Sequence, residues 1–182
     1  MTTPQDELRR SVDAGAVALE RRLRDLVSPL QVAVRGTRPP GGGWSLDMIL
    51  EHLCLANGAY LAEMEGAVTT HGAPLRNGAW SPTLGGRLLV HFMRSERRLP
   101  APKSMVPGPV PSEQVLDAML DSLAVLRALL ARADRLEWRK TRLVSPFARW
   151  LPLNLGDAAL IILTHSQRHA NQVARLRESL GA

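Results

Sequence analysis

Four long stretches of the sequence repeat apolar residues every three or four positions, a period that fits α-helices. They cover residues 4–34, 45–68, 112–130 and 154–180, and a shorter apolar stretch over 84–99 is also expected to be helical. The sequence contains no internal repeat and no strand-like alternation longer than a few residues. We therefore predict an all-α fold, an antiparallel four-helix bundle.

Proline, glycine and capping residues divide these stretches. Residues 36–43 combine two prolines with four glycines, and residues 100–111 contain five prolines. Neither segment can continue a helix, so the bundle should have a long middle connection. The expected N-caps are Ser45, Ser112 and Asn154. Residues 135–153, with two tryptophans and two prolines, fit no single element.

The size and composition predict one soluble domain over residues 1–182. Of these residues 45% are hydrophobic and 22% are charged, which suffices for a core without disulfides. Cys54 is the only cysteine, which favours a reducing compartment. No apolar run approaches the roughly 18 residues of a membrane span, and the first residues lack a signal-peptide pattern. We expect a cytoplasmic protein with no membrane association.

The basic charge has two interpretations. Lysine and arginine number 23 against 17 acidic residues, a formal net charge of +6. The arginines are dispersed along the chain, and aromatic residues make up only 4%. This pattern favours an arginine-rich solvated surface, because single-strand binders need aromatic stacking platforms. Nucleic-acid binding through phosphate contacts is kept as the least favoured hypothesis.

Three histidines are expected to face the core of the bundle. At 100° per residue, His165 and His169 lie about 40° apart on the apolar side of the last helix. His52 stands among apolar neighbours on the second helix, about 100° from Glu51. The opposite, solvent-facing side of that helix should carry Asp47, Glu51, Gly58 and Glu65.

The spacing of His165 and His169 suits a shared cation. One helical turn separates them, so their rings can converge on one metal ion. With His52 as third ligand, a position would stay open for water or substrate, as in catalytic zinc sites. An isolated His-x3-His pair is a weak signal, and histidines satisfied within the core are the alternative. Ser166 stands where metalloproteases of the HExxH type have their glutamate, so protease chemistry is not expected.

Gln172 and Cys54 are two further candidate residues near these histidines. Gln172 follows His169 on the same face and could orient a ligand or a bound water. A helix-end amide bonded to the backbone is an equal alternative. Cys54 lies about 160° around the helix from His52, so we expect a core residue rather than a ligand.

Two motifs resemble those of DinB-like proteins. Trp44-Ser-Leu-Asp-Met-Ile-Leu-Glu-His52-Leu is similar to their tryptophan–serine opening and first histidine. Leu163-Thr-His165-Ser-Gln-Arg-His169-Ala-Asn-Gln172 is similar to their closing histidine pair followed by glutamine. The order and separation of the two motifs also agree.

The resemblance implies a helical bundle in which three histidines hold a divalent metal, often nickel or zinc. The corresponding residues here are His52, His165 and His169. It also implies a homodimer, and some relatives use a low-molecular-weight thiol such as mycothiol or bacillithiol as transferases or isomerases. Our leading hypothesis is a metal-dependent enzyme that activates a thiol or water to attack a small-molecule substrate. The alternative is a non-catalytic metal-binding or stress-related protein that acts through its dimer.

Overall fold

The computed structural model describes residues 2–71, 74, 78–95 and 100–181, and this part of the chain is mostly helical. The described α-helices are α1 (Gln5–Val27), α2 (Val32–Gly36), α3 (Leu46–His71), α4 (Leu84–Arg94), α5 (Val115–Arg132) and α6 (Leu155–Ser179). The other elements are the strands β1 (Thr3–Pro4), β2 (Ala79–Trp80), β3 (Arg142–Ser145) and β4 (Ala148–Asn154), and the 3-10 turns η1 (Lys103–Met105) and η2 (Ala133–Arg135). Within the described residues, no helix combines the length and apolarity needed to cross a bilayer. The helical class predicted from the sequence is confirmed.

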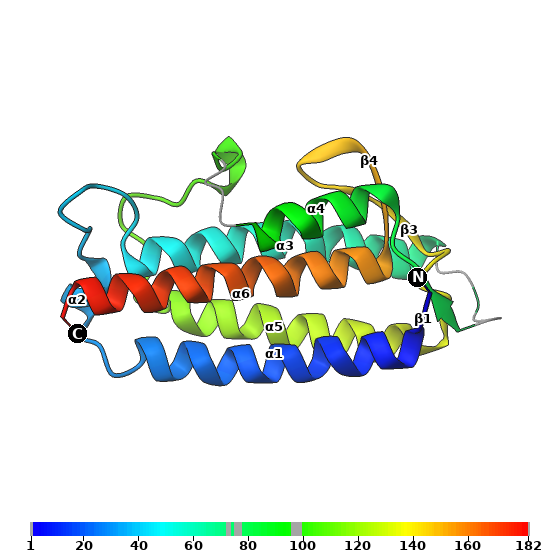
Figure 1. Cartoon of the computed structure of the whole chain (residues 1–182), viewed down its shortest axis with the longest axis horizontal. Coiled ribbons are helices and arrows are strands. Elements are labelled where there is room, and N and C mark those ends of the chain that lie inside the picture. The colour runs from blue at the N-terminus through cyan, green and yellow to red at the C-terminus, as the bar shows by residue number, and fades with distance from the viewer. Residues whose placement is uncertain (1, 72–73, 75–77, 96–99, 182) are drawn as a thin grey trace.

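The four long helices α1, α3, α5 and α6 lie side by side and enclose the core (Figure 1). α1 contacts α5 and α6, and α3 contacts the same two helices. The predicted apolar stripe of α1 is buried, with Leu8, Val12, Ala16, Leu19 and Leu23 at most 6% exposed. α1 ends at Val27, before Pro29, and the stretch over 4–34 expected to be one helix continues only after a turn, as the short helix α2 from Val32 to Gly36.

Side-chain pairs establish that α1 and α5 run in opposite directions. Asp13 pairs with Arg127 of α5, whereas Arg9, one turn earlier in α1, pairs with Asp134 of η2, the turn that follows α5. α3 and α6 also run in opposite directions (Figure 1): His52, early in α3, meets His165 and His169 along α6, whereas Tyr60, later in α3, meets Ser145 in the strand that precedes α6. These two contacts agree with the antiparallel arrangement expected from the sequence.

The other two contacts are parallel, which corrects that expectation. Asn57 of α3 donates to Ser122 of α5 over 3.0 Å, and Glu65, two turns later, pairs with Arg132. The numbering therefore rises in the same direction along both helices. The reason is the long middle connection between α3 and α5, which returns the chain to the end of the molecule where α3 begins (Figure 1). α1 and α6 are parallel for the same reason.

Two of the three predicted N-caps, Asn154 and Ser45, are confirmed. The Asn154 side chain accepts from the Asp157 N–H, and the Asp157 carboxylate accepts from the Asn154 N–H, a capping box that begins α6. Ser45 accepts from the Met48 N–H over 3.3 Å at the start of α3. Ser112 does not cap α5, which begins three residues later at Val115.

A buried ion pair corrects the predicted solvent face of α3. Asp47 is only 4% exposed, and its carboxylate lies 3.5 Å from the Arg35 guanidinium of α2. Arg35 also donates to the Glu113 carbonyl over 2.9 Å. Burial raises the pKa of Asp47, and the Arg35 charge opposes this. The pair joins α2, α3 and the approach to α5.

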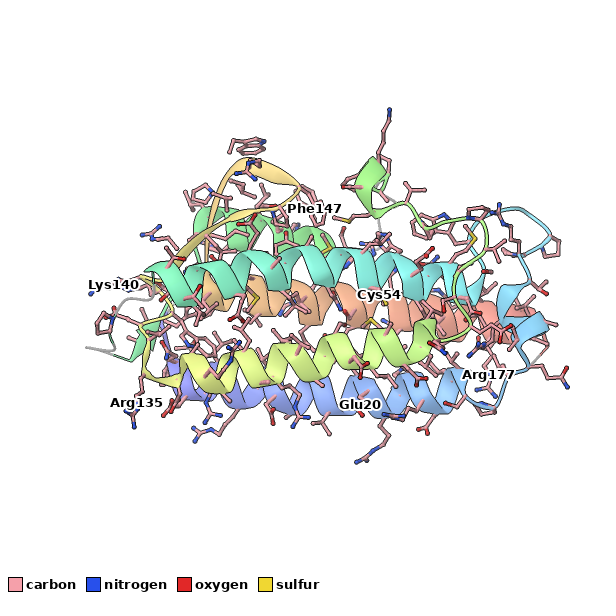
Figure 2. The ribbon with its side chains drawn as sticks, turned by 180° about the vertical axis from the view of Figure 1, so that it is seen from behind. Glu20, Cys54, Arg135, Lys140, Phe147 and Arg177 are labelled. Atoms are coloured by element: carbon pink, nitrogen blue, oxygen red, sulfur yellow. The ribbon has the colours of Figure 1, made fainter. Side chains whose placement is uncertain are left out.

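The ambiguous residues before α6 form a β-hairpin, which the sequence did not predict. β3 and β4 pair antiparallel around Pro146 and Phe147. Figure 2 shows Phe147 where the hairpin lies over α3, and its ring packs edge-on against Tyr60 at 5.7 Å. The hairpin packs against α3 and α4, and β4 leads directly into α6.

Two adjacent glycines let α4 approach the hairpin and α6 closely. A Cβ on Gly85 would lie 2.7 Å from the Leu151 side chain, and one on Gly86 would overlap the Asp157 carboxyl group. Asp157 also accepts from Thr83, the N-cap of α4, over 2.7 Å. The glycines that weaken the helical pattern of 84–99 are thus required by packing. α4 ends at Arg94, and residues 96–99 of that stretch lie outside the described residues.

We expect Gly86→Ala to lower the free energy of unfolding by about 1–3 kcal/mol, because the added methyl group displaces the Asp157 cap. Gly58→Ala is the matched control, since nothing lies within 4 Å of its Cβ position on α3. It should be neutral or raise stability by up to about 1 kcal/mol through helix propensity. Urea denaturation measures the free energy of unfolding of both variants. If Gly58→Ala were destabilised as much as Gly86→Ala, the packing argument would be contradicted.

Candidate metal centre

The side chains of His52, His165 and His169 converge between α3 and α6. The His165 Nε2 atom lies 3.3 Å from Nε2 of His52 and 3.1 Å from Nε2 of His169. One ligand atom from each ring lies within 4.8 Å of the others. His52 is 3% exposed, and the other two are partly buried. The structure thus brings together the three histidines that the sequence singled out.

Helix geometry accounts for this convergence. His165 and His169 lie one turn apart on the face of α6 that meets α3, and their ring centroids are 4.6 Å apart. His52 lies one turn and a half into α3, which crosses this face in the opposite direction. The capping box at Asn154 defines where α6 begins and therefore where its histidines lie.

The outer nitrogens of two rings have acceptor partners. The Nδ1 atom of His52 lies 2.8 Å from the Met105 carbonyl oxygen, which can only accept. His52 therefore carries its proton on Nδ1 and presents the Nε2 lone pair to the cluster. The Nδ1 atom of His169 lies 2.8 Å from Oε1 of Gln172, which assigns the same tautomer to that ring. Gln172 thus orients a histidine, rather than bonding to the helix backbone.

The donor set fits a divalent cation. Nitrogen ligands about 2.0–2.1 Å from a tetrahedral zinc ion lie about 3.3 Å from one another, close to the 3.1 and 3.3 Å separations between the Nε2 atoms. Neutral imidazoles bound through Nε2, with Nδ1–H donating to a carbonyl, are typical of metal sites. The three histidines could therefore hold a metal ion, with zinc, nickel, iron and copper all compatible with imidazole ligands.

The surroundings keep the rings neutral. Burial lowers the pKa of His52, against a smaller raising effect from the Met105 carbonyl. Burial, followed by the neighbouring His169 and His52, lowers the pKa of His165 well below its usual value. Burial and then His52 lower the pKa of His169 to about 4. Because only an unprotonated nitrogen can ligate, these shifts favour metal binding near neutral pH.

Two neighbours of the cluster were not found by sequence reasoning. The Met105 carbonyl belongs to the proline-rich connection, and Glu51 anchors that connection by accepting from the Gly108 N–H over 2.6 Å. The ring of Trp44, just before α3, lies with its centroid 4.9 Å from that of the His52 ring, at an angle of 43°. A backbone carbonyl has no sequence signal, so only the fold could identify Met105.

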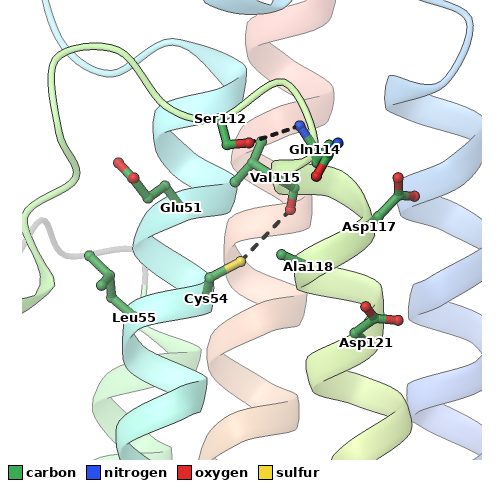
Figure 3. A pocket seen from close by; sticks show the side chains of 9 residues that line it. All are labelled: Glu51, Cys54, Leu55, Ser112, Gln114, Val115, Asp117, Ala118 and Asp121. Carbon is green, nitrogen blue, oxygen red and sulfur yellow. Dashed lines mark hydrogen bonds between the residues drawn. The ribbon is translucent and has the colours of Figure 1, made fainter.

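Cys54 lies away from the cluster, as the sequence predicted. It faces a groove of about 480 Å³ between α3 and α5 (Figure 3). The thiol donates to the Val115 carbonyl over 3.8 Å, and burial raises its pKa to about 11. Cys54 is therefore neither a ligand of this centre nor a reactive thiolate.

We expect Gln172→Leu to weaken metal binding about 10–100-fold, because it removes the acceptor that orients His169. Gln172→Glu keeps an acceptor and should retain most of the affinity. Gln167→Leu, an exposed position on α6, is the control. Competition with a chelator of known affinity measures all three, and equal affinities for the two leucine variants would argue against an orienting role.

The lowered histidine pKa values also predict how metal-free stability depends on pH. In the unfolded chain a histidine binds its proton near pH 6.5, whereas folded His169 does so near pH 4. Between these values the unfolded state holds more protons, so the free energy of unfolding should fall as the pH is lowered.

Urea titrations at pH 7, 6, 5 and 4.5 measure this slope. Burial raises the pKa values of Asp47 and Asp157, which act in the opposite direction. The comparison with His169→Gln, in which both aspartates remain, isolates the histidine contribution. The slope should be smaller in that variant, and an unchanged slope would contradict a neutral His169.

The comparison with protein families agrees with this arrangement. The family model described as the DinB superfamily matches residues 17–173, which include all three histidines and most of the four long helices. No match was found among curated proteins or among solved structures. The chain belongs to the DinB superfamily.

Proposed function

We propose that this protein is a metal-dependent enzyme in which His52, His165 and His169 hold a divalent cation, zinc or nickel. The observation that supports it best is the meeting of three Nε2 atoms, 3.1 and 3.3 Å apart, with the outer nitrogens of two rings bonded to acceptors. A cation bound there would lower the pKa of a thiol or a water molecule and so supply an anionic nucleophile near neutral pH.

Other residues of the chain would orient the histidines and enclose the site. The Met105 carbonyl and Gln172 keep a proton on the Nδ1 atoms of His52 and His169, so that both Nε2 atoms stay available. The Trp44 ring covers one side of His52 and limits the access of water there. Trp44, His52 and Met105 thus join the start of α3 and the proline-rich connection into one wall of the site.

A thiol from outside the chain is the preferred nucleophile. Cys54 cannot supply it, because its pKa is raised to about 11 and it faces the groove toward α5. The cluster found among the described residues consists of histidines alone, so it offers no carboxylate to take up a proton. A thiol, with a pKa of about 8.5, needs less help to ionise than water does. We infer a low-molecular-weight-thiol transferase acting on a small molecule.

We further propose that the fold is a four-helix bundle that forms a homodimer. The contacts of α1 and α3 with both α5 and α6 support the bundle. The exposed apolar residues Leu84 (82%), Leu88 (47%) and Trp150 (79%) support the dimer. They lie on α4 and on the adjoining strand β4, and a second copy would remove this surface from water.

The enzymatic proposal predicts metal-dependent consumption of a cellular thiol in the presence of electrophilic substrates. Metal-loaded protein should conjugate one of several thiols, mycothiol and bacillithiol included, whereas His169→Ala should lose at least about 100-fold in rate with its metal. His91→Ala is the control, because His91 is an exposed histidine outside the cluster. Tight metal binding without turnover of any thiol would instead favour the non-catalytic metal-binding protein.

The dimer is tested by light scattering coupled to size-exclusion chromatography. The expected mass is about twice the 19.9 kDa of one chain. Trp150→Ser should shift the equilibrium toward the monomer, and Val125→Ser, at a half-exposed position on α5, should not. A monomeric wild-type protein at high concentration would contradict the proposal.

A further inference from the structure

A second cavity, of about 520 Å³, lies between the C-terminal end of α4 and the polar face of α6. Three arginines line it, Arg94 from α4 and Arg168 and Arg175 from α6, together with the amides of Gln167 and Asn171. Among its described lining residues there is no aspartate or glutamate. Its volume lies within the range of about 300–1,000 Å³ that is common for small-molecule sites.

Hydrogen bonds fix two of the residues that line the cavity, Arg168 and Asn171. Arg168 donates to the carbonyl oxygens of Phe92 and Ser95, at the end of α4. Arg22 of α1 donates to the Oδ1 atom of Asn171 over 2.7 Å, which leaves the Asn171 amide nitrogen as a donor for other partners. Both contacts reach α6 from neighbouring helices, so the arrangement does not depend on exposed side chains alone.

The other polar groups that line the cavity are mostly hydrogen-bond donors. Arg94 and Arg175 are exposed, and neither forms an ion pair with another described residue. A guanidinium group has five N–H donors and no acceptor. Arg94 and Arg175 place two such groups at one cavity, where their like charges repel, and an anion would relieve that repulsion. Carboxylate and phosphate groups match the planar donor pair of arginine.

The cavity and the metal centre share helix α6. Arg168 directly precedes His169, and Thr164, which also lines the cavity, directly precedes His165. Burial is the main reason for the lowered pKa values of both histidines, but the Arg168 charge adds to it. Successive residues of a helix point about 100° apart, so the cavity and the histidines occupy neighbouring faces of α6.

We propose that the cavity between α4 and α6 binds a small anion through a carboxylate or phosphate group. Its role in positioning an acidic substrate or thiol rests on the proposed function, whereas anion binding itself does not. The competing explanation is structural: Arg94 and Arg168 lie at the C-terminal end of α4, where positive charge stabilises a helix. Arg175 lies four residues before the end of α6 at Ser179, so its charge also stands near a helix C-terminus, and the anion titrations below separate the two explanations.

The test uses inorganic phosphate and succinate, titrated calorimetrically into metal-free protein at low salt and pH 7.5. We expect saturable binding of at least one anion with a stoichiometry near one, weakened by added salt. Arg175→Gln and Arg94→Gln should each weaken it by about tenfold, and Arg175→Lys should retain most of it. Arg10→Gln, an exposed arginine on α1, is the matched control. Circular dichroism verifies that each variant is folded.

His169→Ala separates the two proposals. Anion binding that survives in this variant, while metal binding is lost, supports a cavity distinct from the histidines. Anion binding that is lost in His169→Ala but kept in Arg175→Gln would overturn the proposal, since the anion would then sit on the histidines. The proposal would also be overturned if neither anion bound saturably, or if Arg10→Gln weakened binding as much as the cavity variants. Binding of a DNA oligonucleotide without binding of either small anion would overturn it as well. Failure of metal binding with phosphate binding intact would reject the proposed function alone.

Discussion

The packing of α3 against α6 is the contact on which the rest of the molecule depends. It is antiparallel, so a residue early in α3 meets residues well along α6, and His52 thereby meets His165 and His169. The Nε2 lone pairs of His52 and His169 both face Nε2 of His165, which carries at most one proton, so at least one buried lone pair lacks a donor, at a cost in free energy. A shared cation removes that cost, which gives this seam a chemical reason beyond packing.

The connections between helices complete the centre. The middle connection makes α5 parallel to α3, and its proline-rich part places the Met105 carbonyl on His52. Prolines suit this segment because they keep it extended and cannot join a helix. Gly85 and Gly86 let α4 lie close to the hairpin and α6. α4 in turn forms one side of the arginine-lined cavity, so both candidate sites depend on the same connection.

Helical periodicity and side-chain spacing predicted the long helices, the N-cap at Asn154 and the inward direction of the three histidines. They could not predict what depends on contacts between distant segments. Asp47 looked solvent-facing because its buried partner Arg35 comes from another helix. β3 is only four residues long, and Pro152 interrupts the pattern of β4, so no alternation stood out in the sequence. Helix directions were missed because periodicity carries no information on how a long connection returns. The metal itself, the substrate and the dimer stay predictions.

The most direct measurement of the central claim is X-ray absorption at the metal edge, on protein purified without a histidine tag and loaded with zinc or nickel. The account predicts one ion per chain, with the scattering pattern of three imidazole rings at about 2.0–2.1 Å. In a variant with His52 replaced by alanine, one imidazole should be lost from that shell. A shell of oxygen ligands alone, or one that is the same with and without His52, would contradict it.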